Sequence, residues 1–405
     1  MTRLPTPAYD DAAAWTRAHL QHVARDDVAA SPAFRGGQTA ADAALAAFDV
    51  AGYAARRNEV HPPQRRGASR LSPYIRHGLL PLRTVWEHVD GGPRRDVEKF
   101  RDELLWQEYA RHLHARTGGL RRSVRYAVPE RSSDLAAWDA DVERMACLQL
   151  VTAELERDGW LVNQTRMWTA SHWAVRRGLG WRDGDDLLFA HLLDGSRAAN
   201  RLGWQWTAGA GTGKPYGFSR WQVEKRAPGV CAGCELRRAC PIQQWPDEEA
   251  LAPVPEVPGV RRDPDPAATA GPRAPEGEGL VDAVWLTAES LGDDDPALAA
   301  HPDAPAVFVL DEPLLARLQL SGKRLVLLAE CLADLAGRRE VEVPLGDTVE
   351  VLAGRRLATT FAPVPGWRRR AAQIRPAVVH PWPWLVQPHG GPAGSFTAWR
   401  KAARV

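Results

Sequence analysis

Apolar residues return every three or four positions through most of the first 245 residues. The pattern is clearest in FRDELLWQEYARHLHAR (residues 100–116) and ERMACLQLVTAELERDGW (residues 143–160). Because one face of an α-helix repeats every 3.6 residues, this spacing predicts a helix in each stretch. We therefore expect residues 1–245 to form an all-helical domain.

The chain changes character after residue 245. Residues 246–280 hold eight prolines among Gly, Ala and acidic residues, with no apolar period, which is typical of a linker. Single cores rarely grow past about 250–300 residues, so a chain of 405 residues has room for a second domain beyond this linker.

Short apolar runs predict that the second domain contains a sheet. The runs at residues 282–288, 305–312 and 376–382 suit buried parallel strands, and residues 323–339 have helical spacing. The expected fold class is α plus α/β, in which a small parallel-sheet α/β domain over residues 281–405 follows the helical one.

The composition narrows the class of protein. Hydrophobic residues make up 44% and charged residues 25%, no apolar run reaches 18 residues, and the N-terminus lacks the apolar core of a secretion signal. We expect a globular, cytoplasmic protein without a membrane segment. The net charge of +2 means that nucleic acid would have to meet a local basic surface. Candidates for that surface are Arg56, Arg57, Arg65, Arg66, Lys214 and Arg220, although arginine-rich runs are more often solvated.

Four segments place polar and aromatic side chains together. Ser69, Arg70 and Ser72 stand at a predicted helix start, which suits a phosphate or a simple N-cap. The other three segments present sets of residues at helical spacing: Glu103, Trp106 and Gln107; Asn163, Arg166 and Met167; and Asp194, Asn200, Trp204 and Trp206. Such groups suit a planar heterocycle with hydrogen-bonding edges, although each alone fits an ordinary core face.

The cysteines have the spacing of metal or cluster ligands. Cys231, Cys234 and Cys240 lie close in sequence, Pro241 follows the last, and Cys147 lies on a predicted helix upstream. Four thiolates of this kind suit a [4Fe-4S] cluster, which we favour, and a structural zinc ion accepts the same set. Cys331 lies in an apolar helix and is expected to be a small buried residue.

The order of the four segments resembles a known family. The chain carries SRLSPYI, ELLWQE, GWLVNQTRM and DGSRAANRLGWQW in that order. They resemble the FAD-binding domain of the photolyase and cryptochrome family, whose sequences carry SRLSPYL, ELxWRE, GWxxNRxRM and DGDxAxNxxGWQW. The resemblance covers about residues 50–245 and implies FAD as cofactor and damaged DNA as partner. The cysteine region resembles the iron-sulfur branch of bacterial photolyases and cryptochromes.

The resemblance implies roles for individual residues. Cofactor contacts are implied for Tyr53, Ser69, Arg70, Leu71, Ser72, Gln107, Asn163, Arg166, Asp194 and Asn200, with Asn200 against flavin N5. The cavity for a flipped-out pyrimidine dimer is implied to contain Glu103, Trp106, Met167 and Trp206. A chain of indoles from flavin to surface is implied to consist of Trp204, Trp181 and Trp138.

The C-terminal part resembles the α/β antenna domain that ordinarily precedes the FAD domain, so the chain reads as a domain-order permutant. The family's arginine-rich WFRRDLR pattern is replaced by WLTAESL, which puts an antenna chromophore in doubt.

The resemblance implies blue-light-driven repair of pyrimidine dimers by electron transfer from reduced FAD, with a cryptochrome-like light sensor as the rival. A light-independent flavin and iron-sulfur electron carrier is a third hypothesis. Glu103, Met167 and Asn200 favour repair. Gln107 and Gln164, which stand where the family has arginine, favour the sensor.

Overall fold

A computed structural model describes residues 2–246 and 250–403 of the chain. Residues 247–249, which belong to the predicted linker, lie outside the described residues, as do residues 1, 404 and 405 at the ends of the two predicted domains.

The predicted helices of the first part are present. They are α1 (Ala12–Leu20), α2 (Gln38–Ala46), α3 (Tyr53–Arg56), α4 (Ser72–Arg76), α5 (Leu82–His88), α6 (Arg94–Arg116), α7 (Leu135–Arg144), α8 (Ala146–Asp158), α9 (Asn163–Ala170), α10 (Trp181–His191), α11 (Arg197–Thr207) and α12 (Arg220–Arg226). Residues 100–116 lie within α6, as their spacing predicts. Residues 143–160 form the end of one helix and a second helix, because Met145 is buried with an extended backbone (φ −89°, ψ 106°) and separates α7 from α8.

The C-terminal part is an α/β unit whose sheet is mostly parallel. Its strands are β1 (Thr2–Leu4), β2 (Ala283–Leu286), β3 (Ala306–Phe308), β4 (Leu310–Asp311), β5 (Val341–Gly346), β6 (Leu357–Thr360) and β7 (Val378–His380). The order across the sheet is β1-β5-β3-β2-β6-β7, with β4 also paired to β5. Every residue of β2 and β6 is buried, as expected for strands covered by helices on both faces.

Five helices of the C-terminal part connect and cover these strands: α14 (Pro296–Ala300), α15 (Glu312–Leu318), α16 (Gly322–Ala336), α17 (Thr348–Leu352) and α18 (Trp367–Ile374). Two further helices contact α6 of the helical part: α13 (Pro266–Ala270), which lies within the predicted linker, and α19 (Phe396–Ala402). The strand and helix expectations for residues 282–288, 305–312, 323–339 and 376–382 are therefore confirmed.

The N-terminus differs from the all-helical prediction. β1 pairs antiparallel with β5, so Thr2 lies opposite Leu345, and the first residues of the chain belong to the sheet of its last third. α1 packs on α16, and the backbone N–H of Gly36 donates to the buried Glu330 carboxylate at 2.7 Å. β1 forms because the open edge of β5 offers unpaired backbone N–H and C=O groups. The three residues of β1 carry no local signal of that distant partner, so the sequence alone did not predict the strand.

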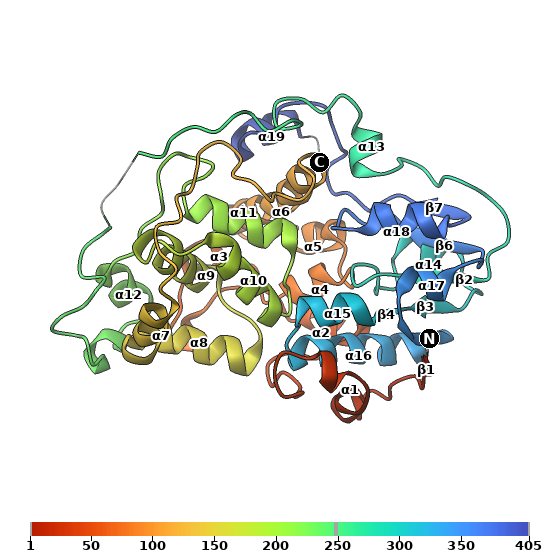
Figure 1. Cartoon of the computed structure of the whole chain (residues 1–405), viewed down its shortest axis with the longest axis horizontal. Helices are drawn as coiled ribbons and strands as arrows, with labels where there is room; N and C mark the ends of the chain where they lie inside the picture. Colours follow the sequence, from red (N-terminus) through yellow and green to blue (C-terminus); the bar gives the residue numbers. More distant parts are fainter. Residues whose placement is uncertain (1, 247–249, 404–405) are drawn as a thin grey trace.

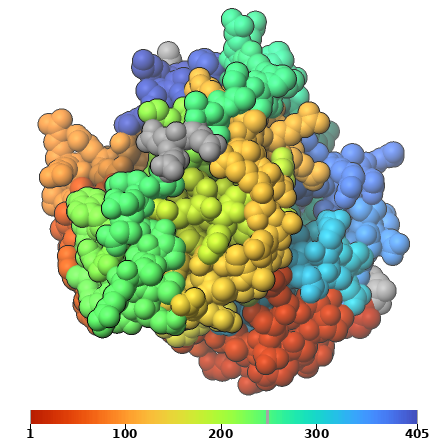
Figure 2. Space-filling model, turned by 60° about the vertical axis from the view of Figure 1, so that its left-hand side comes forward, coloured from red at the N-terminus to blue at the C-terminus, as the bar shows by residue number. Residues whose placement is uncertain are grey.

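The helical and α/β parts lie side by side and share a hydrophobic core. Figure 1 shows the helices on one side, the sheet on the other, and the segment after residue 250 crossing between them. One core contains both Leu104 of α6 and Leu286 of β2. Figure 2 shows the N-terminal residues, in red, along the base of the molecule beside C-terminal residues in blue. Among the described residues, no helix is long and apolar enough to span a bilayer.

Candidate functional site

A cavity of about 610 Å³ lies among the helices of the first part. α3, α4, α6, α9, α10 and α11 contribute to its wall. The predicted site residues in its lining are Tyr53, Ser69, Arg70, Ser72, Glu103, Trp106, Gln107, Asn163, Arg166, Met167, Asp194, Asn200, Trp204 and Trp206. The cavity lies within the range of about 300–1,000 Å³ that is usual for small-molecule and cofactor sites.

Two buried polar atoms in the wall lack a partner. The Asp194 carboxylate accepts a hydrogen bond from Arg166 at 2.7 Å through Oδ2, while its Oδ1 is buried without a partner in the described part of the chain. The same holds for Nδ2 of Asn200. Leaving such an atom unsatisfied costs about 1–3 kcal/mol. A vacant acceptor and a vacant donor suit the polar edge of a heterocycle, so this wall fits a flavin.

Glu103 is held by two neighbours that sequence reasoning did not connect to it. The Tyr53 hydroxyl donates to Oε2 of Glu103 at 2.5 Å, and Nε of Arg57 donates to Oε1 at 2.6 Å. Burial, aided by the charge of Glu103, raises the pKa of Tyr53 well above its usual value, so the phenol keeps its proton. The carboxylate is thus fixed in position while 38% of its side chain stays exposed.

The segment before α4 contacts the cavity through some of its predicted residues. Ser72 begins the helix, as expected, and accepts a hydrogen bond from Nε1 of Trp160 at 3.0 Å. Arg70 donates to the Ala33 carbonyl oxygen, so its guanidinium is partly engaged within the chain. Leu71 is fully buried in the core and does not line the cavity, so its side chain makes no direct contact with a ligand there.

The C-terminal helix closes one side of this cavity. Phe396, the first residue of α19, lines the cavity and packs edge-on against Trp106, with 5.3 Å between ring centroids. Arg400 forms an ion pair with Asp102 on α6 at 2.5 Å. No local motif marks Phe396 as a site residue, because nearly three hundred positions separate it from α6 in the chain.

One of the three predicted indoles lines the cavity, and an indole that was not predicted lies beside it. Trp204 lines the cavity, whereas Trp181 and Trp138 do not. The ring of Trp204 lies 6.5 Å from that of Trp173, and Trp173 lies 4.9 Å from Trp138. The guanidinium of Arg182 lies 4.9 Å from the ring of Trp181. Sequence reasoning missed Trp173 because it belongs to none of the four family segments.

The four predicted ligand cysteines line one small cavity of about 20 Å³. These are Cys147, Cys231, Cys234 and Cys240, and none is in a disulfide. Burial, followed by the charges of Cys231, Cys240 and Cys234, raises the pKa of Cys147 to about 12. Within residues 2–246 and 250–403, no three His, Cys, Asp or Glu side chains are close enough to hold a single metal ion. Cys331 is buried in α16, as predicted.

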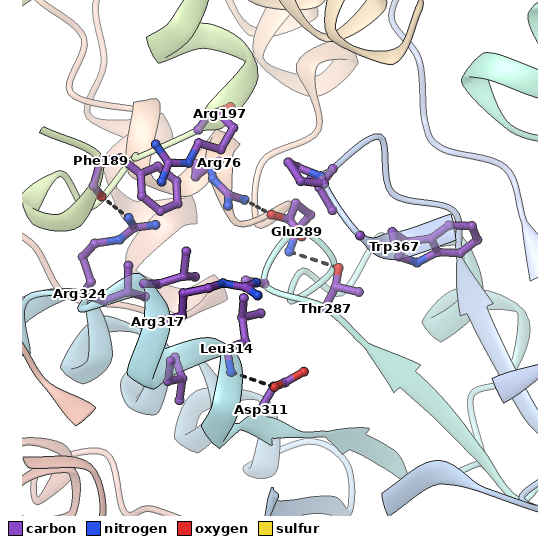
Figure 3. A pocket seen from close by; sticks show the side chains of 18 of the residues that line it. Arg76, Phe189, Arg197, Thr287, Glu289, Asp311, Leu314, Arg317, Arg324 and Trp367 are labelled. Carbon is purple, nitrogen blue, oxygen red and sulfur yellow. Dashed lines mark hydrogen bonds and ion pairs between the residues drawn. The ribbon is translucent and has the colours of Figure 1, made fainter. Parts of the chain in front are cut away.

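A second cavity, of about 1,110 Å³, lies where the two parts meet. Residues that follow β2 and β3 line it, so it opens at the carboxyl ends of parallel strands, a usual place for ligands in α/β sheets. Figure 3 shows Arg76, Arg197, Arg317 and Arg324 toward one end and Trp367 toward the other.

Some arginines of the second cavity form ion pairs or hydrogen bonds within the chain. Arg76 pairs with Glu289 at 2.5 Å, and Arg324 donates to the carbonyl oxygens of Phe189 and Gly195. Burial, followed by the charge of Arg76, lowers the pKa of Arg324 to about 9. The excess of guanidinium groups beside flat aromatic rings gives this cavity the chemistry to hold an anion attached to a ring.

Comparisons with known proteins agree with the interpretation of the 610 Å³ cavity as a flavin site. The family model described as "FAD binding domain of DNA photolyase" matches residues 100–225, which include α6, α9 and α11. This part of the chain is therefore similar to the FAD-binding domain of DNA photolyases, which supports a flavin site there.

Relatives and solved structures match a limited share of each chain. The sequence is 29% identical over 192 residues to the deoxyribodipyrimidine photo-lyase of Synechococcus sp., covering 43% of this chain and 39% of the relative. It is 34% identical over 186 residues to that of Thermus thermophilus, covering 43% of each. A class III photolyase from Agrobacterium tumefaciens matches at 25% identity over 42% of this chain and 38% of that one, with a TM-score of 0.39. This chain thus spans less than half of each relative.

Proposed function

We propose that the protein repairs pyrimidine dimers in DNA with FAD and blue light. The observation that carries this proposal is the 610 Å³ cavity, in which four separated segments converge on unsatisfied polar atoms. The match of residues 100–225 to the FAD-binding domain of DNA photolyase supports the same ligand.

The wall of the cavity provides groups that bind FAD and groups that bind the flipped-out pyrimidine dimer. Bound FAD in its reduced state supplies the electron that splits the dimer after light absorption. Asn200 and Asp194 bind the polar edge of the flavin through their vacant atoms. Glu103, oriented by Tyr53 and Arg57, accepts a hydrogen bond from the flipped-out dimer. Trp106 and Trp206 stack on the dimer, and Met167 fills the space beside it.

Several arginines that the sequence offers for a DNA-binding surface form ion pairs within the chain. Arg57 pairs with Glu103, Arg66 with Glu154, and Arg220 with Glu224. Arg65 likewise pairs with Glu59. Arg57 and Arg66 are partly buried in these pairs, so phosphate contacts at these arginines would form by exchange of partners. A DNA substrate also requires a protein that acts in the compartment of the DNA, which supports the expected cytoplasmic location.

A repair assay separates enzyme from light sensor. Purified protein with reduced FAD is mixed with oligonucleotides that carry either a cyclobutane dimer or a (6-4) lesion, with and without blue light. Loss of the cyclobutane dimer only in the light is expected. If neither lesion is repaired by protein with flavin bound, the enzyme is eliminated. Photoreduction of the flavin without repair would then favour the sensor over the light-independent electron carrier.

We also propose that the four-cysteine cavity holds a [4Fe-4S] cluster. Its support is that all four cysteines line one small cavity. A structural zinc ion accepts the same four thiolates, so the composition of the purified protein decides between the two metal centres. Iron and sulfide analysis, together with a broad absorption band beyond the flavin bands, tests it.

The domain arrangement is a further part of the proposal. The helical part at residues 1–245, the linker at 246–280 and the α/β part at 281–405 form a photolyase-like chain with its antenna-like domain last. The second cavity gives that domain room for a ligand, which the replaced WLTAESL segment had put in doubt. Extraction of the purified protein with acid, followed by mass spectrometry, would identify any pigment other than FAD.

A further inference from the structure

Trp173 lies in a continuous row of indole rings that begins at the wall of the flavin cavity. The Trp204 and Trp173 centroids are 6.5 Å apart with their planes at 87°, and those of Trp173 and Trp138 are 4.9 Å apart at 67°. All three side chains are buried. Trp138 lies on the inner face of α7, whose neighbouring positions 139 and 140 are exposed. The row therefore connects the cavity with a surface helix.

The backbone that carries Trp173 has an uncommon conformation. Residues Ser171–Arg176 form a π-helical turn directly after α9, and the N–H of Arg177 donates to the carbonyl oxygen of His172 at 2.9 Å. Such turns are rare and occur often at functional sites, because the wider turn changes the direction of the side chains that follow. The indole N–H of Trp173 donates to the Gly180 carbonyl oxygen at 2.8 Å, which fixes the ring.

Charge distinguishes this row from one through Trp181. An indole that loses an electron becomes positive, and the guanidinium of Arg182, 4.9 Å from the Trp181 ring, opposes that charge. Within the part of the chain that the structure describes, no cation lies over the rings of the row and no close ring contact joins Trp181 to Trp204. Asp141, one helical turn from Trp138, is paired with His172 and Arg177, so it adds little net charge beside that ring.

We infer that Trp173 is the middle electron donor between Trp204 and Trp138 when the bound flavin is photoreduced, an inference that rests on the proposed flavin-dependent function. Trp204 passes one electron to the light-excited flavin, and Trp173 passes one electron to the oxidised Trp204. Trp138 then passes one electron to the oxidised Trp173. A soluble thiol returns one electron to Trp138, so each indole ends in its original state and no bond in the protein changes.

The test compares three Trp→Phe variants that carry oxidised FAD. Trp173→Phe removes the middle ring, Trp181→Phe removes the alternative, and Trp168→Phe is the control. Trp168 belongs to the same core as Trp173 and is fully buried, but its ring stacks on Phe218 outside the row. Flavin absorbance is followed under blue light with a thiol present. Trp173→Phe is expected to slow photoreduction at least about tenfold, while the other two variants stay within about twofold of the parent.

The opposite ranking overturns the inference. If Trp181→Phe stops photoreduction while Trp173→Phe leaves it intact, electrons pass through Trp181. Should Trp173→Phe fail to fold, Trp181→Phe still decides, because a tenfold loss in that variant contradicts the row and normal photoreduction supports it.

Two further measurements separate this inference from the proposed function. Repair by chemically reduced Trp173→Phe protein should equal that of the parent, because the row serves only photoreduction. If the parent binds no FAD, the proposed function fails, whereas a wrong ranking with FAD bound refutes the row alone. In flavin-free protein, the Trp138 and Trp173 rings should give a coupled near-ultraviolet circular dichroism signal. Trp173→Phe should remove that signal and Trp168→Phe should keep it. If both variants keep the signal, the contact between the Trp138 and Trp173 rings is contradicted.

Discussion

A methyl group added at Gly184 on α10 should displace Trp204, which lines the 610 Å³ cavity. A Cβ placed on Gly184 would lie 2.2 Å from Cη2 and 2.6 Å from Cζ3 of the Trp204 indole. Non-bonded carbon atoms prefer separations of about 3.5–4.0 Å. Gly184→Ala must therefore move Trp204 or α10 by more than about 1 Å. Since Trp204 also lines the flavin cavity, the movement changes the shape of that cavity.

Two opposing effects determine the size of the change. Alanine is favoured over glycine in a helix interior by about 0.5–1 kcal/mol. Overpacking a buried site costs about 1–3 kcal/mol. We expect Gly184→Ala to lower the free energy of unfolding by about 1–2 kcal/mol. The control is Gly203→Ala on α11, where an added Cβ meets no heavy atom within 4 Å. That variant should be about 0.5–1 kcal/mol more stable than the parent.

Urea unfolding of flavin-free protein, followed by circular dichroism, measures both variants under identical conditions. FAD titration of Gly184→Ala, followed by flavin fluorescence, should show weaker binding. A Gly184→Ala protein as stable as Gly203→Ala would refute the reasoning, because it would mean that Trp204 does not pack against α10.

Three further predictions concern single carboxyl and thiol groups. Glu103→Ala should lower dimer repair at least about tenfold with flavin still bound, because the flipped-out pyrimidine dimer loses a fixed hydrogen-bond acceptor. The control, Glu98→Ala on the exposed face of α6, should repair normally. Equal repair by the two variants would contradict the role of Glu103 in binding the dimer. Burial raises the pKa of Glu108 to about 7, so its stabilising contribution is complete below about pH 4.5 and is lost as the pH rises to about 7. Between about pH 4.5 and pH 7, the free energy of unfolding of the parent should fall by about 2–3 kcal/mol relative to that of Glu108→Gln. If the two proteins show the same pH dependence of unfolding, the pKa of Glu108 is not raised. Cys147→Ser should abolish the expected iron-sulfur absorption while Cys331→Ser keeps it, and an unchanged spectrum in the first variant would remove Cys147 from the ligand set.

Local spacing in the sequence was enough for most of the elements, whereas the cavity wall was expected from the resemblance to a known family. The three-to-four periodicity within α6 and the apolar runs of β2, β3 and β7 follow from which faces must be buried, and each element can be read without its neighbours. The four segments could be assigned to one site because, in order, they resemble segments of a known FAD-binding domain, and the structure brings their side chains to a single cavity.

Tertiary structure alone decided the contacts between distant segments. The pairing of β1 with β5, the closure of the cavity by Phe396 and the row through Trp173 each join residues whose local sequence carries no mark of the other partner. The second cavity arises in the same way, where the helical part meets the carboxyl ends of the strands. The physical reason is that local propensity specifies which face of an element is buried, whereas the partner of that face depends on how all the elements pack at once.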